Sequence, residues 1–164
     1  YEDIALPIGQ SDSQTTISQP YTIAEMLTLL DLKKGNITLE IGSGSGYVLA
    51  LIHEITNGKT YGIEIIKQLA ELSRERLKEI KDIEIFNKNG FDGLSERAPF
   101  DRIIISAAID EIPKPLITQL KENGIIVAPI NQFSQQALTK YQKENNILML
   151  KEQLPGFIFV RFVK

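Results

Sequence analysis

The stretch Leu39–Tyr47 limits the choice of fold more than any other part of the sequence, because glycine occupies every second position between two regular patterns. A β-rich run ends at Ile41, the glycines are Gly42, Gly44 and Gly46, and a helical pattern follows at once. Glycine permits sharp turns with positive φ and lets a ligand lie against bare backbone. A helix N-terminus adds unpaired N–H groups and a positive dipole end. The pattern predicts a loop that binds a nucleotide-like ligand.

The spacing of the glycines narrows the choice of ligand. A dinucleotide fingerprint, G-x-G-x-x-G, needs its third glycine where this chain has Tyr47, and a P-loop needs a Lys after Gly46. An acidic residue followed by G-x-G-x-G resembles the S-adenosylmethionine site of Rossmann-like methyltransferases. A flexible Gly/Ser turn is the alternative, and the flanking strand and helix make it the weaker one. The resemblance assigns cofactor contacts to Glu40, Gly42, Ser43, Gly44 and Gly46.

Composition sets broad limits on the class of protein. With 164 residues, 43% of them hydrophobic and 24% charged, we expect a single domain over residues 1–164. A net charge of -3 argues against a nucleic-acid partner, and no apolar run is long enough for a bilayer. No cysteine and one histidine argue against a disulfide scaffold, a thiolate nucleophile and a metal site.

Alternating strand and helix patterns predict an α/β fold, a Rossmann-like three-layer sandwich around a mostly parallel sheet. Predicted strands are 37–41, 59–64, 82–86, 101–106 and 125–129, and predicted helices are 20–31, 47–56, 66–80 and 113–120. Residues 1–19 show no period and predict an extended arm. Near the end, 138–143 and 147–152 flank a hairpin signal at 144–146, and 157–163 is a further β run, so the C-terminal strands should be antiparallel.

A carboxylate at the end of the second predicted strand suggests how a ribose would be held. In open α/β sheets ligands bind beyond the carboxyl ends of the strands. Glu64 ends its strand 22 residues after Gly42, a spacing that suits an acceptor for both ribose hydroxyls. A solvent-facing acid is the less favoured alternative. The loops expected to meet at this edge are 42–46, 64–66, 87–93 and 106–112.

Asn89 and Gly90 follow the third predicted strand, where an adenine edge would lie. The Asn89 side-chain oxygen could accept from the adenine amino group, and Gly90 would allow close approach. A turn-forming Asn-Gly pair explains the same residues equally well. His53, inside the predicted helix after the loop, is expected to have no catalytic role.

Motifs along the whole chain resemble the protein-L-isoaspartate O-methyltransferase family, in the family's order. The glycine loop alone is typical of any class I methyltransferase, whereas the segment before Pro20 and the terminal Val-Arg-Phe-Val are much more specific. The segments are Leu6–Gly9, Thr16–Tyr21, Leu39–Tyr47, Ala98–Ile104, Ser106–Ala108 with Ile112–Pro113, Gln119–Lys121 and Val160–Val163.

The resemblance implies an enzyme that moves the methyl group of S-adenosylmethionine onto the free carboxylate of an L-isoaspartyl residue in a damaged protein or peptide, leaving S-adenosylhomocysteine. The ester then closes to a succinimide, which allows repair to aspartate. Ser18 would lie beside the methyl donor and the acceptor carboxylate. Thr16, Ile17 and Gln19 would form part of the cofactor wall, and Gln136 would complete the pocket. We expect a cytoplasmic monomer.

The chemistry of this reaction agrees with the residues available. The acceptor carboxylate, with a solution pKa of about 4, is already an anion at neutral pH, and a sulfonium is an activated leaving group. Alignment and exclusion of water therefore suffice. Ser18 would orient the carboxylate through a hydrogen bond. Its alternative role is to cap the helix predicted over 20–31.

Three departures from the family pattern leave two rival functions open. Asn89 stands where the family has Asp, residues 10–14 form a longer link, and a helical region usual before the position of Tyr1 is absent from this sequence. One rival is a related methyltransferase that esterifies a different carboxylate, as in a dedicated peptide partner. The other is a non-catalytic cofactor-binding homologue, against which the intact Thr16–Ser18 segment argues.

Overall fold

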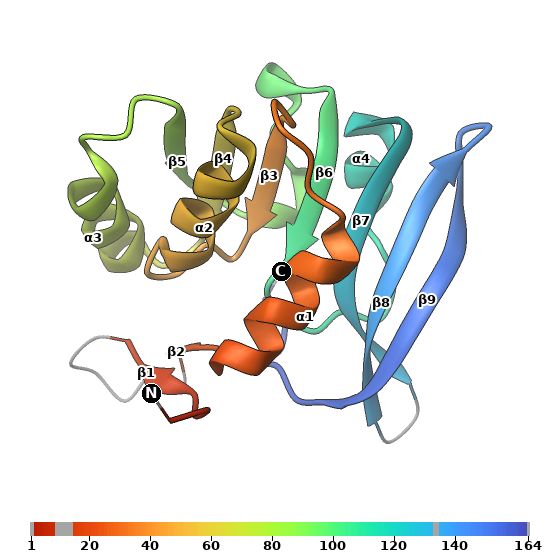
Figure 1. The fold of residues 1–164 in the computed structure, drawn as a ribbon, viewed down its shortest axis with the longest axis horizontal. Helices are drawn as coiled ribbons and strands as arrows, with labels where there is room; N and C mark the ends of the chain where they lie inside the picture. Colours follow the sequence, from red (N-terminus) through yellow and green to blue (C-terminus); the bar gives the residue numbers. More distant parts are fainter. Residues whose placement is uncertain (1, 9–14, 133–134, 164) are drawn as a thin grey trace.

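A seven-stranded sheet forms the centre of the computed structural model, which describes residues 2–8, 15–132 and 135–163. The strand order is β5-β4-β3-β6-β7-β8-β9 (Figure 1). The strands are β3 (Thr38–Ile41), β4 (Thr60–Glu64), β5 (Ile83–Asn87), β6 (Phe100–Ile105), β7 (Leu120–Gln132), β8 (Gln135–Glu144) and β9 (Ile147–Phe157).

The first five strands pair in parallel, and β8 and β9 add antiparallel strands at one edge. The β8–β9 turn contains Asn145 and Asn146 with φ of 52° and 63°, values that Asn tolerates better than most residues. The predicted α/β class and the antiparallel C-terminal strands are confirmed.

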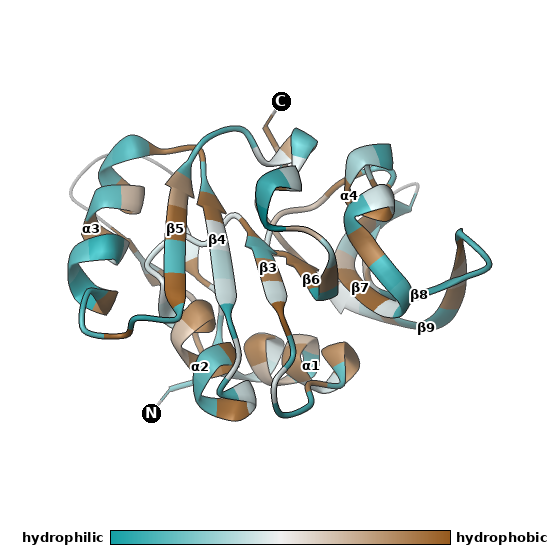
Figure 2. Ribbon diagram, turned by 90° about the horizontal axis from the view of Figure 1, so that it is seen from above, coloured by the Kyte–Doolittle hydropathy of each residue, from teal (hydrophilic) through white to brown (hydrophobic). Residues whose placement is uncertain are grey.

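Helices cover both faces of the sheet, which gives three layers (Figure 2). The helices are α1 (Pro20–Leu30), α2 (Tyr47–Thr56), α3 (Lys67–Leu77), α4 (Lys114–Gln119), η1 (Gly90–Asp92) and η2 (Ser95–Arg97). The first two, α1 and α2, lie on one face, and α4 lies on the other. Because these strands are parallel, the loops after β3, β4 and β6 lie at the same end of the sheet. This is the end where ligands bind in this class of fold.

The strand β6 shows how the core is shared between the layers. Ile103, Ile104 and Ile105 are all fully buried. Because side chains alternate along a strand, Ile104 packs into the cluster that contains α1, and its two neighbours pack into the cluster that contains Leu116 of α4. A continuous apolar run is typical of a strand buried on both faces.

The structure differs from the predicted elements at both ends of the chain and in one helix. The arm contains a short antiparallel pair, β1 (Leu6–Pro7) and β2 (Thr16–Ile17), called here the N-terminal hairpin. The helix predicted over 66–80 ends at Leu77. The prediction of a last strand over 157–163 is wrong, because β9 continues through Pro155 to Phe157 and the chain then leaves the sheet. The longer link at 10–14 and Tyr1 lie outside the described residues.

No helix within the described part of the chain combines the length and the apolar character needed to cross a membrane.

Candidate functional site

A cavity of about 360 Å³ lies at the carboxyl ends of the central strands. It runs from Glu64 and Ile65 after β4, past the glycine loop after β3, to Ser106 after β6. Residues of the N-terminal arm and residues 160–163 of the C-terminal segment (158–163) supply much of its remaining wall. The wall residues are Ile8, Thr15, Thr16, Ile41, Gly42, Gly44, Ile63, Glu64, Ile65, Ile66, Leu69, Gly90, Ser106, Ala107, Val160, Arg161, Phe162 and Val163.

The glycine loop is held by its own backbone. The N–H groups of Gly42 and Ser43 both donate to the carbonyl of Ile63, at 2.8 and 3.0 Å. Gly46, the N-cap of α2, has φ of 81°, and a Cβ there would lie 2.8 Å from Leu77 of α3. Glycine is therefore required at Gly46 both by its backbone conformation and by the packing of α3.

Glu64 is buried at the end of β4, and both of its carboxylate oxygens accept backbone hydrogen bonds. Oε2 accepts from Gly44 N at 2.8 Å, and Oε1 accepts from Ile66 N at 2.8 Å. The side chain thus ties the glycine loop to the loop after β4. Each oxygen keeps a further lone pair for a ligand hydroxyl, so the ribose role predicted for Glu64 is compatible with this structural one.

Glu40 lies behind the cavity wall and does not line the cavity. Its Oε1 accepts a hydrogen bond from Ser106 Oγ at 2.9 Å, and Ser106 does line the cavity. Among the described residues, its Oε2 and the hydroxyl of buried Ser43 have no hydrogen-bond partner. Burial, reinforced by the charge of Glu64 and opposed by the Ser106 hydrogen bond, raises the pKa of Glu40 to about 8. Glu40 therefore carries a proton at neutral pH in this structure.

Asn89 and Gly90 occupy the start of η1 after β5. The Asn89 side chain accepts from Phe91 N at 2.9 Å, which is the turn-forming role considered from the sequence. Gly90 lines the cavity, whereas Asn89 does not. A Cβ on Gly90 would lie 2.3 Å from Ile41 Cγ2, so the close approach that requires glycine is to strand β3.

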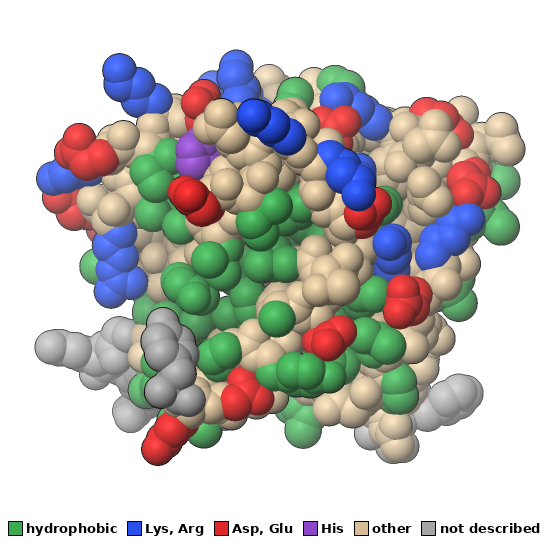
Figure 3. Space-filling model, in the orientation of Figure 1, with side chains coloured by type: hydrophobic (Ala, Val, Ile, Leu, Met, Phe, Trp, Pro, Cys, Tyr) green, Lys and Arg blue, Asp and Glu red, His purple; other side chains and the backbone are tan. Residues whose placement is uncertain are grey.

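The residues of the Thr16–Gln19 segment face different spaces. Thr16 lines the cavity, whereas Ile17 and Ser18 line a neighbouring apolar cavity of about 450 Å³ with Tyr47 and Ile23. Apolar side chains gather where α1, α2 and the N-terminal hairpin meet (Figure 3). Gln19 is the N-cap of α1 and its side chain makes no capping hydrogen bond, whereas Asp3 Oδ1 accepts from Tyr21 N in the first turn of the helix at 2.8 Å. The capping alternative for Ser18 is therefore wrong.

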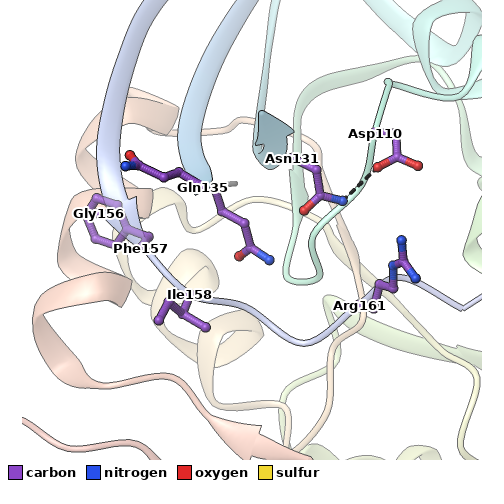
Figure 4. A pocket seen from close by; sticks show the side chains of 8 residues that line it. Asp110, Asn131, Gln135, Gly156, Phe157, Ile158 and Arg161 are labelled. Carbon is purple, nitrogen blue, oxygen red and sulfur yellow. Dashed lines mark hydrogen bonds between the residues drawn. The ribbon is translucent and has the colours of Figure 1, made fainter. Parts of the chain in front are cut away.

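Gln136 lies on β8, outside the cavity wall. Its Oε1 accepts from Phe159 N at 2.6 Å, and its Nε2 donates to Phe159 O at 3.3 Å. It lines a second cavity of about 740 Å³, here called the outer cavity, beside Asn131 and Asp110 (Figure 4). In this structure Gln136 holds the C-terminal segment in place.

The C-terminal segment is the part of the wall that the sequence pattern did not reveal. Its alternating apolar residues predict a strand, yet only Arg161 forms a bridge, an isolated one to Ala108 in the loop after β6. Val160, Phe162 and Val163 instead close the cavity over Ser106. The one available signal was the family-specific Val-Arg-Phe-Val motif, which carries no information about its position in space.

The residues present suit S-adenosylmethionine. The cofactor has a sulfonium and an ammonium group against one carboxylate, so it is a net cation, and Glu64 offers negative charge on the wall. The glycine loop exposes backbone at the N-terminus of α2, which suits the cofactor's carboxylate. Ile65, Ile66 and Leu69 supply an apolar surface near Glu64, as a ring system needs.

Comparisons with known proteins agree on one family. The family model described as protein-L-isoaspartate(D-aspartate) O-methyltransferase (PCMT) matches residues 1–164. The protein-L-isoaspartate O-methyltransferase of Dictyoglomus turgidum is 43% identical over 162 residues, covering 98% of this chain and 71% of the relative. That of Pyrococcus horikoshii is 36% identical over 166 residues, covering 99% and 73%.

Solved structures agree as well. A protein-L-isoaspartate O-methyltransferase superposes with a TM-score of 0.90 at 29% identity, covering 98% of this chain and 52% of that one, so the present chain spans about half of its length. A putative Plasmodium falciparum enzyme in complex with S-adenosylhomocysteine gives 0.85 at 28% identity, covering 99% and 81%. With the glycine loop and Glu64 in place, the chain belongs to the protein-L-isoaspartate O-methyltransferase family of class I S-adenosylmethionine-dependent methyltransferases.

Proposed function

We propose that this protein transfers the methyl group of S-adenosylmethionine to the free α-carboxylate of L-isoaspartyl residues in proteins and peptides, and so acts in their repair. Family membership supports the substrate. The observation that carries the proposal is the cavity itself, which joins the glycine loop and buried Glu64 at one end to walls containing Thr16 and Arg161 at the other. One end suits a cofactor and the other an incoming chain.

Backbone and carboxylate groups would hold the cofactor, which when bound supplies a methyl group on a positively charged sulfur. Glu64 would accept from the ribose hydroxyls with the lone pairs that Gly44 and Ile66 leave free. Gly90 would border the adenine, and Gly42 would let the ligand lie against the loop. Direct cofactor contacts of Glu40, Asn89 and Gln136 have less support, because these side chains lie outside the cavity wall.

The acceptor needs no activation by a base. An isoaspartyl α-carboxylate, with a pKa of about 4 in solution, is an anion at neutral pH. One of its oxygens forms the bond to the methyl carbon as the carbon–sulfur bond breaks, the electron pair stays with sulfur, and no proton moves. What remains for the protein is to align the acceptor and to exclude water.

Ser18 would orient the acceptor through a hydrogen bond from its hydroxyl. Ser18 lies two residues after Thr16, which lines the cavity at the strand ends. Ser18 itself borders the neighbouring apolar cavity, whose wall also contains Tyr47, the first residue of α2. Gln19, not Ser18, is the N-cap residue of α1, which leaves the Ser18 hydroxyl available for this contact.

The expectations of a monomer and of a cytoplasmic location stay proposals. Size-exclusion chromatography with light scattering tests the oligomeric state, and cell fractionation tests the location.

Methyl transfer to an isoaspartyl peptide, measured beside its aspartyl twin, tests the proposed function. We expect incorporation into the isoaspartyl peptide alone. Transfer to neither peptide, with S-adenosylhomocysteine still bound, would favour a non-catalytic homologue. Equal transfer to both would show that the acceptor is a different carboxylate.

A further inference from the structure

Arg161 is the cation that the proposed mechanism has not used. Among the described residues, it is the only positively charged side chain on the wall of the cavity, and it also lines the outer cavity. Its backbone position is fixed on both sides, since Ala108 N donates to Val160 O at 2.8 Å and Phe162 N donates to Ala108 O at 2.9 Å. The guanidinium therefore stands at the junction of two spaces.

The charge of Arg161 is not neutralised by its acidic neighbour. Asp110 lies at the same end of the outer cavity (Figure 4), but its Oδ1 accepts a hydrogen bond from Asn131 Nδ2 at 2.8 Å. Within the described residues, Arg161 takes part in no ion pair and no side-chain hydrogen bond. An exposed, unpaired guanidinium beside a cavity is well suited to bind a carboxylate.

The order of the strands indicates which carboxylate this is. From β4 through β3 to β6, the cavity passes Glu64, then the glycine loop, then Ser106, with Arg161 at the far end. A cofactor whose ribose lies on Glu64 has its own carboxylate beside the N-terminus of α2, midway along this path. The space beyond, which opens into the outer cavity, is left for the second substrate.

We infer that Arg161 binds the acceptor carboxylate, and that the peptide enters through the outer cavity lined by Asp110, Asn131 and Gln135. This inference rests on the proposed function and names the residue that recognises its substrate. The guanidinium pairs with the charged acid, whose charge falls as the ester forms. Its contribution is therefore larger in the bound state than in the transition state, and its loss should raise KM without lowering kcat.

A binding experiment with a neutral analogue separates this role from a structural one. Calorimetry would measure the binding of an isoaspartyl peptide and of its α-carboxamide to the enzyme saturated with S-adenosylhomocysteine. We expect wild type to prefer the acid by about 10- to 100-fold, the scale of a charged hydrogen-bonded pair. In Arg161→Gln the preference should fall to about threefold or less. Arg161→Lys should keep part of it, because it keeps the charge and loses the planar fork.

Controls make each outcome decisive. Arg76→Gln removes the same charge from the exposed face of α3 and should behave as wild type. A full preference for the acid in Arg161→Gln would overturn the inference. So would a loss of S-adenosylhomocysteine affinity in that variant, which would assign Arg161 to the cofactor. If wild type methylates the isoaspartyl peptide but Arg161→Gln keeps its preference for the acid over the carboxamide, only this inference is wrong. If wild type methylates no peptide, the proposed function itself is wrong.

Discussion

The two ends of the cavity are built in different ways. At the glycine-loop end (residues 42–46 and 64–66), Glu64 is 5% exposed and both of its oxygens are bound by backbone. At the open end (the N-terminal hairpin and residues 158–163), Ile158 is 95% exposed and Leu6 is 52% exposed. The first end is set before any ligand arrives, whereas the second is held through backbone hydrogen bonds of Phe159, Val160 and Phe162 and leaves large apolar side chains exposed. The difference suggests that cofactor geometry is preorganised and that substrate choice resides in the open end.

The largest effect on stability should come from Glu64→Ala. The change leaves two partly buried N–H groups, those of Gly44 and Ile66, without their acceptor. We expect the free energy of unfolding to fall by about 2–6 kcal/mol, since each of the two orphaned donors costs about 1–3 kcal/mol. Urea unfolding measures it, with Arg161→Ala at the open end as the control. A loss in the control as large as that in Glu64→Ala would break the comparison.

Two glycines with positive φ sharpen the comparison. At Gly46 (φ 81°) a Cβ would meet Leu77 and Ser73 of α3, whereas at Gly156 (φ 94°), just before the open end, a Cβ would have no described atom within 4 Å. Alanine should cost about 1–2 kcal/mol at either site through backbone strain, and about 1–3 kcal/mol more at Gly46 through overpacking. Denaturation midpoints of both variants test this. Equal losses would mean that packing against α3 contributes nothing.

The buried carboxyl of Glu40 should make stability depend on pH. Its pKa is raised from 4.5 to about 8 in the folded protein, so between these values the folded state holds a proton that the unfolded state has lost. Unfolding free energy should then decrease as pH rises, with a slope of up to about 1.4 kcal/mol per pH unit. Glu40→Gln should remove this slope. Unfolding curves at several pH values check it, and parallel profiles for the two proteins would refute it.

The smallest effect belongs to the open end. Gln136→Ala frees both backbone groups of Phe159 and should cost about 1–2 kcal/mol. Ile158→Ser, one residue before, should change stability by less than about 0.5 kcal/mol because the side chain is almost fully exposed. Thermal unfolding of both variants would measure the difference. An equally large loss in Ile158→Ser would mean that the segment is packed more firmly than its exposure indicates.

Local sequence patterns predicted most of the fold and the glycine-loop end of the site. The helix at 47–56 agrees with its predicted bounds, and Glu64 ends β4 as predicted, because turn residues and periodicity act over a few positions. The open end depends on pairs far apart in the chain, such as Gln136 with Phe159 and Ala108 with Arg161. No local period encodes such pairs. The alternation in 157–163 therefore predicted a strand where the chain closes a cavity.

The site showed the same limit on a finer scale. Sequence spacing marked Gly90 as a place of close approach but could not say that the neighbour is Ile41 of β3. Sequence spacing also could not predict that Thr16 and Ser18, only two positions apart, face different cavities. The direction of a side chain depends on how the hairpin lies on the rest of the fold, and this information is tertiary.

The most direct test of the division between the two ends is a calorimetric titration of S-adenosylhomocysteine into wild type, Glu64→Gln and Ser18→Ala. Glutamine keeps the size of the side chain and one acceptor oxygen. We expect Glu64→Gln to lose about tenfold or more in affinity, as for a hydrogen bond to a charged group. Ser18→Ala should stay within about twofold of wild type while its methyl-transfer rate falls. Equal affinity losses in the two variants, or unchanged binding in Glu64→Gln, would contradict the division.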